Sequence, residues 1–209
     1  MFEMAITIHA NDYASIINKL LPTAFERLDR STALGKTLAQ FKNMPEKMVK
    51  AAVKVLPKDV QDDIVISLFS SYEDKIAQLL NRFAINEQLD LEIKSVRMKK
   101  DKEASQMIIS ANFEVRNYEN LAVKVLPLMN EKLEKATETE TDAQMLELFK
   151  RIPKETYLDF FRNITIDIKD ELVILLLAKY EKKIVNLINE YTAGESIQVE
   201  IVKVIIRKN

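Results

Sequence analysis

The sequence predicts an α+β protein built from two similar halves, each made of a strand, several helices and a second strand. Three observations lead to this prediction. Segments recur at spacings of 105 and then 108 residues, apolar residues alternate with period two at both ends of each half, and the segments between them follow the helical period. The chain of 209 residues is 47% hydrophobic, which is enough apolar material for a packed core.

The two halves resemble each other over nearly their whole length. Early in each half, identical residues lie 105 positions apart, as Tyr13 and Tyr118 do, and later ones lie 108 apart, as Pro45 and Pro153 do. The segment SSYEDKIAQLLNRF at 70–83 returns as AKYEKKIVNLINEY at 178–191. We therefore predict an internal duplication, with pseudo-repeats at 1–104 and 105–209 that together form one intertwined pseudo-twofold domain.

Four strands are expected, at about 2–10, 88–98, 105–115 and 197–206. In the second and fourth strands the apolar residues shift from odd-numbered to even-numbered positions part-way along. This shift predicts a β-bulge near 94–95 and near 202–203. The short polar link at 99–104 predicts a hairpin between the second and third strands. With twofold symmetry, the strand orders 2-3-1-4 and 1-4-2-3 both remain possible, each as one antiparallel four-stranded sheet covered by helices on at least one face.

Helices are expected between the strands of each half. The first begins near Asn11 or Asp12, and a bend is expected at Pro22 and at Pro127 inside the helical pattern. A short helix follows at about 34–43, and another begins near Pro45. The longest helices are expected to run without a break over about 58–83 and 166–191.

Several classes of site are excluded by composition. The sequence has no cysteine and only one histidine, His9, so disulfides, thiolate sites and the usual zinc and triad arrangements are not expected. Two glycines cannot form the usual phosphate-binding loops. We expect no cofactor, no metal site and no catalytic residue.

Composition also bears on location and partners. The 31 basic and 32 acidic residues are spread evenly, so nucleic acid is not an expected partner. The most apolar run, LVILLLA, is too short to cross a membrane, and the first residues lack the pattern of a signal peptide. We expect a cytoplasmic monomer that resembles a fused dimer.

Tyr72 and Tyr180, in matching Tyr-Glu-x-Lys segments, are the candidate ligand-binding residues. They could hydrogen-bond a ligand in a central cavity, with Glu73 or Glu181 as a base. The alternative is a tyrosine whose ring lies in the core beside ordinary surface charges, and this alternative is favoured.

Two charged clusters have similar alternatives. Acidic residues could bind a cation, but charge complementarity at a helix N-terminus is the preferred interpretation for Asp59, Asp62, Asp63, Asp167, Asp170 and Glu171. Basic residues could bind an anionic partner, although protection of strand edges is preferred for Lys94, Arg97, Lys99, Lys100, Lys102, Lys203, Arg207 and Lys208.

The leading functional prediction is a non-enzymatic cytoplasmic binding or protein-interaction protein with an unknown protein or small-molecule partner. One alternative is a small-molecule or lipid-binding protein with a cavity between helices and sheet. The other is an enzyme that uses Tyr, Glu and Lys groups.

Overall fold

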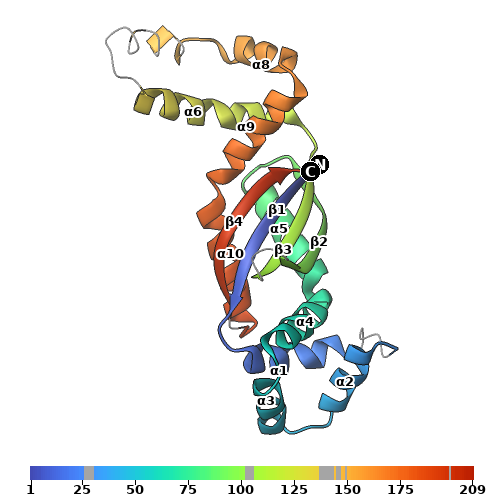
Figure 1. The fold of residues 1–209 in the computed structure, drawn as a ribbon. Helices are drawn as coiled ribbons and strands as arrows, with labels where there is room; N and C mark the ends of the chain where they lie inside the picture. The colour runs from blue at the N-terminus through green and yellow to red at the C-terminus, as the bar shows by residue number, and fades with distance from the viewer. Residues whose placement is uncertain (26–30, 102–105, 137–143, 145–146, 149, 198) are drawn as a thin grey trace.

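A computed structural model shows an elongated molecule, with a sheet at its centre and a group of helices at each end (Figure 1). It describes residues 1–25, 31–101, 106–136, 144, 147–148, 150–197 and 199–209. The predicted α+β class is confirmed. Lys102 of the predicted basic cluster lies outside the described residues.

The sheet contains β1 (Phe2–Ala10), β2 (Leu91–Asp101), β3 (Gln106–Val115) and β4 (Val199–Lys208). Their order is β2-β3-β1-β4, and every neighbouring pair is antiparallel. The first of the two predicted orders is therefore correct. Because β1 lies between β3 and β4, its pairing partners both come from the second half of the chain.

Both predicted β-bulges are confirmed. Along β2, the register against β3 shifts between Ile93 and Ser95. Along β4, Thr7 pairs with Lys203 and the next residue, Ile8, pairs with Ile201, so one residue of β4 is left without a partner on β1. A bulge strengthens the local twist and bends the strand. The two outer strands of the sheet therefore carry the same irregularity.

Two helical groups, which we call the first and second lobes, lie beyond the two ends of the sheet (Figure 1). The first lobe contains α1 (Tyr13–Ala24), α2 (Ala33–Phe41), α3 (Glu46–Lys54) and α4 (Lys58–Phe69). The second contains α6 (Tyr118–Ala136), α8 (Lys154–Asn163) and α9 (Ile166–Ala178). Asp12 caps α1 as predicted, because its side chain accepts a hydrogen bond from the Ser15 amide at 3.1 Å. Pro22 and Pro127 lie inside α1 and α6.

The prediction of unbroken helices over 58–83 and 166–191 is wrong. After α4, a 3-10 turn (Ser70–Tyr72) precedes α5 (Glu73–Asn86), and α9 likewise ends before α10 (Glu181–Gly194). Ser70 and Ser71 donate hydrogen bonds to the carbonyls of Ser67 and Leu68, at 2.7 and 2.8 Å, which competes with helix propagation. The break lets α4 and α9 pack in the lobes while α5 and α10 lie along the sheet (Figure 1).

The main core lies between the sheet and these two helices and extends into the first lobe, and a smaller cluster lies in the second lobe. Phe2 and Phe113 face each other across β1 and β3, and their rings stack 5.2 Å apart. Ile6, Ile76 and Ile184 are fully buried in the same cluster. The opposite face of β1 carries Glu3, Ala5 and Thr7, so the alternation along this strand separates an apolar face from a more polar one.

Gln88 and Ser196 both adopt left-handed backbone conformations, with φ of 52° and 57°. Each follows a helix, α5 or α10, and the next residue closes the end with an amide-to-carbonyl bond of 2.7 Å. Glycine is the residue best suited to this position.

We therefore expect Gln88→Gly to raise the free energy of unfolding by about 0.5–1 kcal/mol. Urea unfolding measures this difference. Gln88→Ala is the matched control and should give no gain, because alanine keeps the steric cost of positive φ. Equal effects of the two substitutions would show that the backbone conformation imposes no strain.

Candidate functional site

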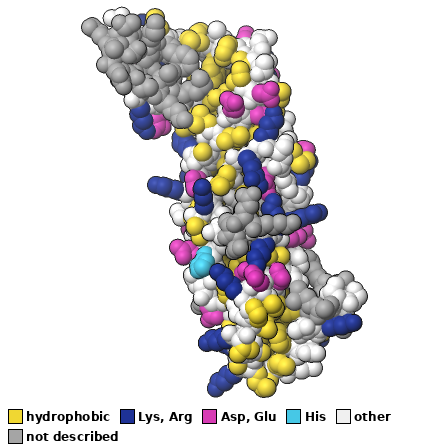
Figure 2. All heavy atoms as spheres, viewed as in Figure 1, with side chains coloured by type: hydrophobic (Ala, Val, Ile, Leu, Met, Phe, Trp, Pro, Cys, Tyr) yellow, Lys and Arg dark blue, Asp and Glu magenta, His cyan; other side chains and the backbone are white. Residues whose placement is uncertain are grey.

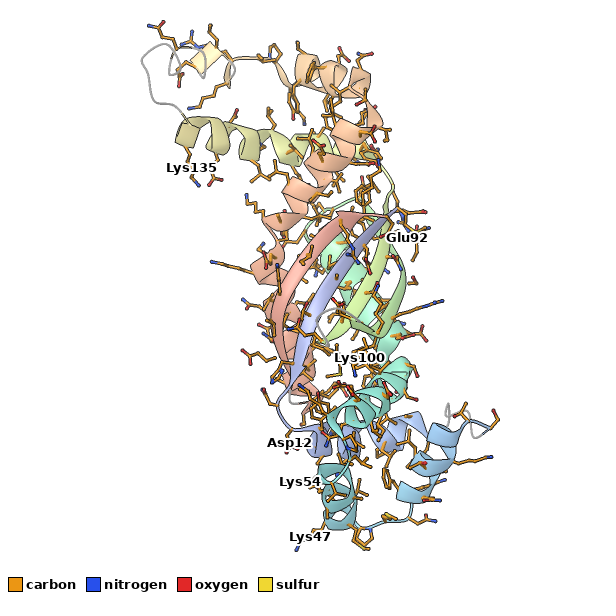
Figure 3. All side chains as sticks on the ribbon, viewed as in Figure 1. Asp12, Lys47, Lys54, Glu92, Lys100 and Lys135 are labelled. Carbon is orange, nitrogen blue, oxygen red and sulfur yellow. The ribbon has the colours of Figure 1, made fainter. Side chains whose placement is uncertain are left out.

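A buried aspartate joins the first lobe to the sheet. Asp62 on α4 is only 2% exposed and accepts a hydrogen bond from the hydroxyl of Tyr13 on α1. Its other oxygen lies 3.4 Å from the ammonium of Lys100 on β2, which also binds the Asp59 carboxylate at 2.5 Å. Figure 3 shows Lys100 where the sheet meets the first lobe. These contacts connect α1, α4 and β2.

The second lobe is joined to the sheet by the same types of residue. The Tyr118 hydroxyl on α6 donates to Asp170 on α9 at 2.6 Å. The Lys208 ammonium on β4 lies 2.8 Å from the other Asp170 oxygen and 2.7 Å from Asp167. Each of these four residues lies 105 or 108 positions after its counterpart in the first group.

Burial and hydrogen bonding shift the pKa values of both tyrosines and of Asp170. Burial and the Asp170 carboxylate raise the pKa of Tyr118 to about 12. Burial and Asp62 likewise raise the pKa of Tyr13. Burial alone would raise the pKa of Asp170, but hydrogen bonds from Lys208 and Tyr118 hold it below its ordinary value. At neutral pH both tyrosines are therefore protonated phenols, and the Asp170 carboxylate is ionised.

The helix-terminus interpretation of these acids was incomplete. Asp59 and Asp167 do lie in the first turns of α4 and α9. Asp62 and Asp170, however, are buried and bound to tyrosine and lysine from other elements. The parallel spacing of Tyr13, Asp62 and Lys100 with the later set was the available signal, but nothing in one sequence indicated their contact.

A third buried acid, Glu3, lies on the polar face of the sheet. It is 4% exposed, and its carboxylate binds Lys99 at 2.7 Å, the Ser110 hydroxyl and the Arg207 Nε at 2.7 Å. Burial acts to raise the pKa of Glu3, but these hydrogen bonds lower it to about 2. Glu3 thus joins β1 to β2, β3 and β4.

The basic cluster that sequence analysis considered for an anionic partner is largely paired. Lys99 and Arg207 bind Glu3, Lys94 lies 2.8 Å from Glu92, and Lys100 and Lys208 bind the lobe aspartates. Such internal pairing lowers the positive potential available to a nucleic acid.

Tyr72 and Tyr180 lie in different surroundings. Tyr72 is buried, with its ring stacked on Phe69 and the Lys75 ammonium 4.8 Å above it. Tyr180 is half-buried and packs edge-on against Phe83, with Lys183 5.4 Å from its ring centre. The structure does not bring the two tyrosines together in any of the three clefts described below.

The glutamates beside these tyrosines lie outside the same clefts. Glu73 is half-buried and accepts a hydrogen bond from the Met98 amide at 3.2 Å, and burial raises its pKa. Since β2 is an edge strand, this contact covers an amide that would otherwise be open to another chain. Glu181 is half-buried in the first turn of α10.

Three clefts lie where the lobes meet the sheet. The second-joint cleft, of about 600 Å³, has Arg116, Lys124 and Lys154 among its lining residues. Two first-joint clefts, of about 610 and 440 Å³, lie at the opposite joint, and their lining includes Glu200 and Glu195 respectively. Tyr72 lines the smaller of these two. Volumes of this size suit small ligands.

The outer surface of α3 carries apolar side chains at helical spacing. We call this surface the α3 stripe and define it by Met44, Met48, Ala51 and Val55, which are all exposed, with Lys47 and Lys54 beside them. Figure 2 shows apolar and basic side chains together at this end of the molecule. Met44 and Met48 thus differ from Met98 and Met107, which are buried in the core.

Comparisons found no match among protein-family models, curated proteins or solved structures. Within the described ranges, no helix is long and apolar enough to cross a membrane. The same part of the chain contains no group of three His, Cys, Asp or Glu residues placed to hold a metal ion. His9 is exposed at the end of β1.

Tyr118→Phe is expected to lower the free energy of unfolding by about 1–2 kcal/mol, because the buried Asp170 loses a donor. Tyr180→Phe is the control, since its hydroxyl makes no hydrogen bond within the described residues and the change should stay within about 0.5 kcal/mol. Chemical denaturation of both variants measures the difference. Equal losses would contradict the anchoring role of Tyr118.

Glu3 should contribute to stability in a way that depends on pH. Its folded-state pKa of about 2 lies below the ordinary value of 4.5, so the contribution is present above pH 4.5 and is lost as the pH falls toward 2. Glu3→Gln should therefore cost about 2–3 kcal/mol at pH 7 relative to the protein with Glu3, and the difference should shrink across that window. Unfolding curves from pH 7 to 2.5 test this, and a constant difference would contradict it.

Proposed function

We propose that this protein is a non-enzymatic, cytoplasmic protein-interaction protein that binds an acidic partner protein through the α3 stripe. This proposal depends on one observation: apolar side chains at helical spacing stay open to solvent along α3 and at its two ends. Val55 is 82% exposed and Met48 is 57% exposed. Clustered exposed apolar side chains rimmed by charge are typical of interaction sites.

The fold holds α3 so that this stripe faces outward. Val49 and Val53, on the other side of the helix, are buried, and α3 packs against α1. Burial of two valines fixes which face is left for a partner, because residues three or four apart share one side of a helix. A docking partner would therefore meet a surface that is already ordered.

Charge on the stripe indicates the chemistry of the partner. Lys47 and Lys54 form no ion pair within the described part of the chain, and Figure 3 shows both at the outer end of the first lobe. Lys50 is paired with Glu46 at 2.7 Å, which leaves the flanking lysines to set the local charge. A partner with apolar residues flanked by Asp or Glu would match both features.

The corresponding helix of the second lobe lacks this combination. The position of Met44 keeps an exposed apolar residue, Ile152, but the positions of Met48, Ala51 and Val55 hold Thr156, Asp159 and Asn163. Phe160 is exposed on α8, where the neighbouring Asp159 is paired with Arg162 at 2.8 Å. The proposed interaction therefore belongs to one lobe.

A non-catalytic role is supported by the state of the buried acids. Asp62, Asp170 and Glu3 are each bound by a hydroxyl and by at least one cation. General acid–base catalysis needs a group that gains and loses a proton near the working pH. The pKa of Glu3 and the pKa of Asp170 are both lowered by these partners, so these two carboxylates stay ionised near neutral pH.

We also propose that the chain arose by duplication and acts as a monomer resembling a fused dimer. The strand registers support this: the pair Ile6–Val204 of β1 and β4 corresponds to Ala111–Val96 of β3 and β2 at the spacings of 105 and 108. The bulges and the two left-handed residues follow the same correspondence. Absence of cysteine fits a reducing compartment.

The α3 proposal predicts binding of a fluorescent helical peptide with leucine on one face and glutamate on both flanks. Fluorescence anisotropy should show binding that weakens with salt, and no binding of the same peptide with lysine flanks. A Lys47→Glu/Lys54→Glu variant should lose about tenfold in affinity for the acidic peptide and gain affinity for the basic one.

Glu155→Lys on α8 is the control and should leave the affinity for the acidic peptide unchanged. Binding that survives charge reversal on α3 would contradict the proposal, and so would failure of both peptides to bind. Vesicles with anionic lipid should not compete with the peptide; competition that depends on Lys47 and Lys54 would assign the stripe to a membrane surface.

The second candidate function is small-molecule binding between helices and sheet. The clefts of about 600 and 610 Å³ at the two lobe–sheet joints favour it. Tyr72 remains a candidate ligand contact because it lines the cleft of about 440 Å³ beside Lys19 and Glu195. Tyr180 remains a candidate only through its sequence equivalence to Tyr72.

A further inference from the structure

The second-joint cleft combines an apolar wall with a basic rim. Ile85, Leu89 and Leu91 come from the end of α5 and the start of β2, and Val123 comes from α6. Leu89 and Leu91 are buried, whereas Ile85 is 72% exposed and leaves apolar surface at the opening. An apolar wall of this kind accommodates hydrocarbon groups.

Three cations from different elements line the same cleft. Arg116 follows β3, Lys124 lies on α6, and Lys154 is the first residue of α8. The one acidic residue in the lining is Asp90, whose carboxylate accepts a hydrogen bond from Asn120 and whose carbonyl binds the Arg116 amide at 2.8 Å. The lining therefore has an excess of positive charge.

Only Arg116 of these cations has an acidic partner at the rim. Its Nε lies 3.1 Å from Glu92, in an exposed pair that Glu92 shares with Lys94. Lys124 and Lys154 form no ion pair within the described ranges, and Lys124 is only half-exposed. Partial burial strengthens the attraction of a lysine for an anion, since solvent screens it less.

The first-joint clefts supply an internal comparison. Lys154 corresponds to Glu46, and Arg116 corresponds to the neutral Asn11, at spacings of 108 and 105. Glu46, Glu195 and Glu200 line those clefts, where Lys19 is the one cation in the lining. Equivalent joints thus carry opposite charge, although the surrounding backbone is alike.

We propose that the second-joint cleft binds a small organic anion, in which a phosphate or carboxylate group contacts Arg116, Lys124 and Lys154. The apolar body of the ligand lies against Leu89, Leu91 and Val123. Guanidinium and ammonium groups bind either type of anion, and the cleft volume of about 600 Å³ suits a molecule of metabolite size. This inference is independent of the α3 stripe, which lies on the other lobe.

Isothermal titration calorimetry of the full chain with hexyl phosphate and hexanoate tests the inference. At least one of them should bind more tightly than inorganic phosphate, which lacks the hydrocarbon chain, and more tightly than hexanol, which lacks the anionic group. Affinity should fall as salt is raised. Amide chemical shifts should change around Leu91, Arg116 and Val123.

Charge-neutral variants locate the site. Lys154→Gln should weaken binding about fivefold or more, whereas Glu46→Gln at the equivalent position of the first joint should not weaken it. Thermal melting checks that both variants remain folded. The inference is overturned if neither amphipathic anion binds better than its controls, if the two substitutions have equal effects, or if the shift changes map to the first joint.

Discussion

Strand β1 makes the two halves of the molecule dependent on each other. It lies in the middle of the sheet and pairs on one side with β3 and on the other with β4, which both belong to the second half. The remaining strand of the first half, β2, pairs with β3 rather than with β1. Neither half therefore contains a pair of neighbouring strands, and an isolated strand cannot satisfy its backbone hydrogen bonds.

The lobes are joined to this sheet by buried polar contacts in addition to apolar packing. Asp62 and Asp170 each connect two lobe helices with a lysine on an outer strand. A buried carboxylate is costly unless it is paired and hydrogen-bonded, so these contacts favour one particular orientation of each lobe. Lobe orientation matters for the proposed functions, because the three lobe–sheet clefts and the outward direction of α3 depend on it.

Much of the fold could be predicted from sequence because its signals are local. The alternation of apolar residues predicted the strands, and the change in this alternation predicted the bulges. The short hairpin link, together with twofold symmetry, restricted the strand order to two possibilities. The break between α4 and α5 was missed, because Ser70 and Ser71 look tolerable within an otherwise continuous apolar stripe. The helix breaks because α4 packs in the lobe and α5 packs along the sheet in a different direction. The periodicity of apolar residues in a helix carries no information about this change of direction.

The candidate sites were harder to predict, since they depend on which residues meet. Tyr72 and Tyr180 stood out in the sequence, yet Arg116, Lys124 and Lys154 did not, because three separate elements bring them to one cleft. The exposure of Met44 and Met48 could not be predicted either, since composition alone cannot tell the buried side of a short helix from the exposed one.

Hydrogen exchange of the intact chain tests the dependence of the two halves most directly. Amides of Ile6 in β1, Ile109 in β3 and Val204 in β4 should exchange with one common free energy, equal to that of global unfolding. Separate free energies for the two halves, with β3 protected while β1 exchanges, would contradict the dependence of each half on the other.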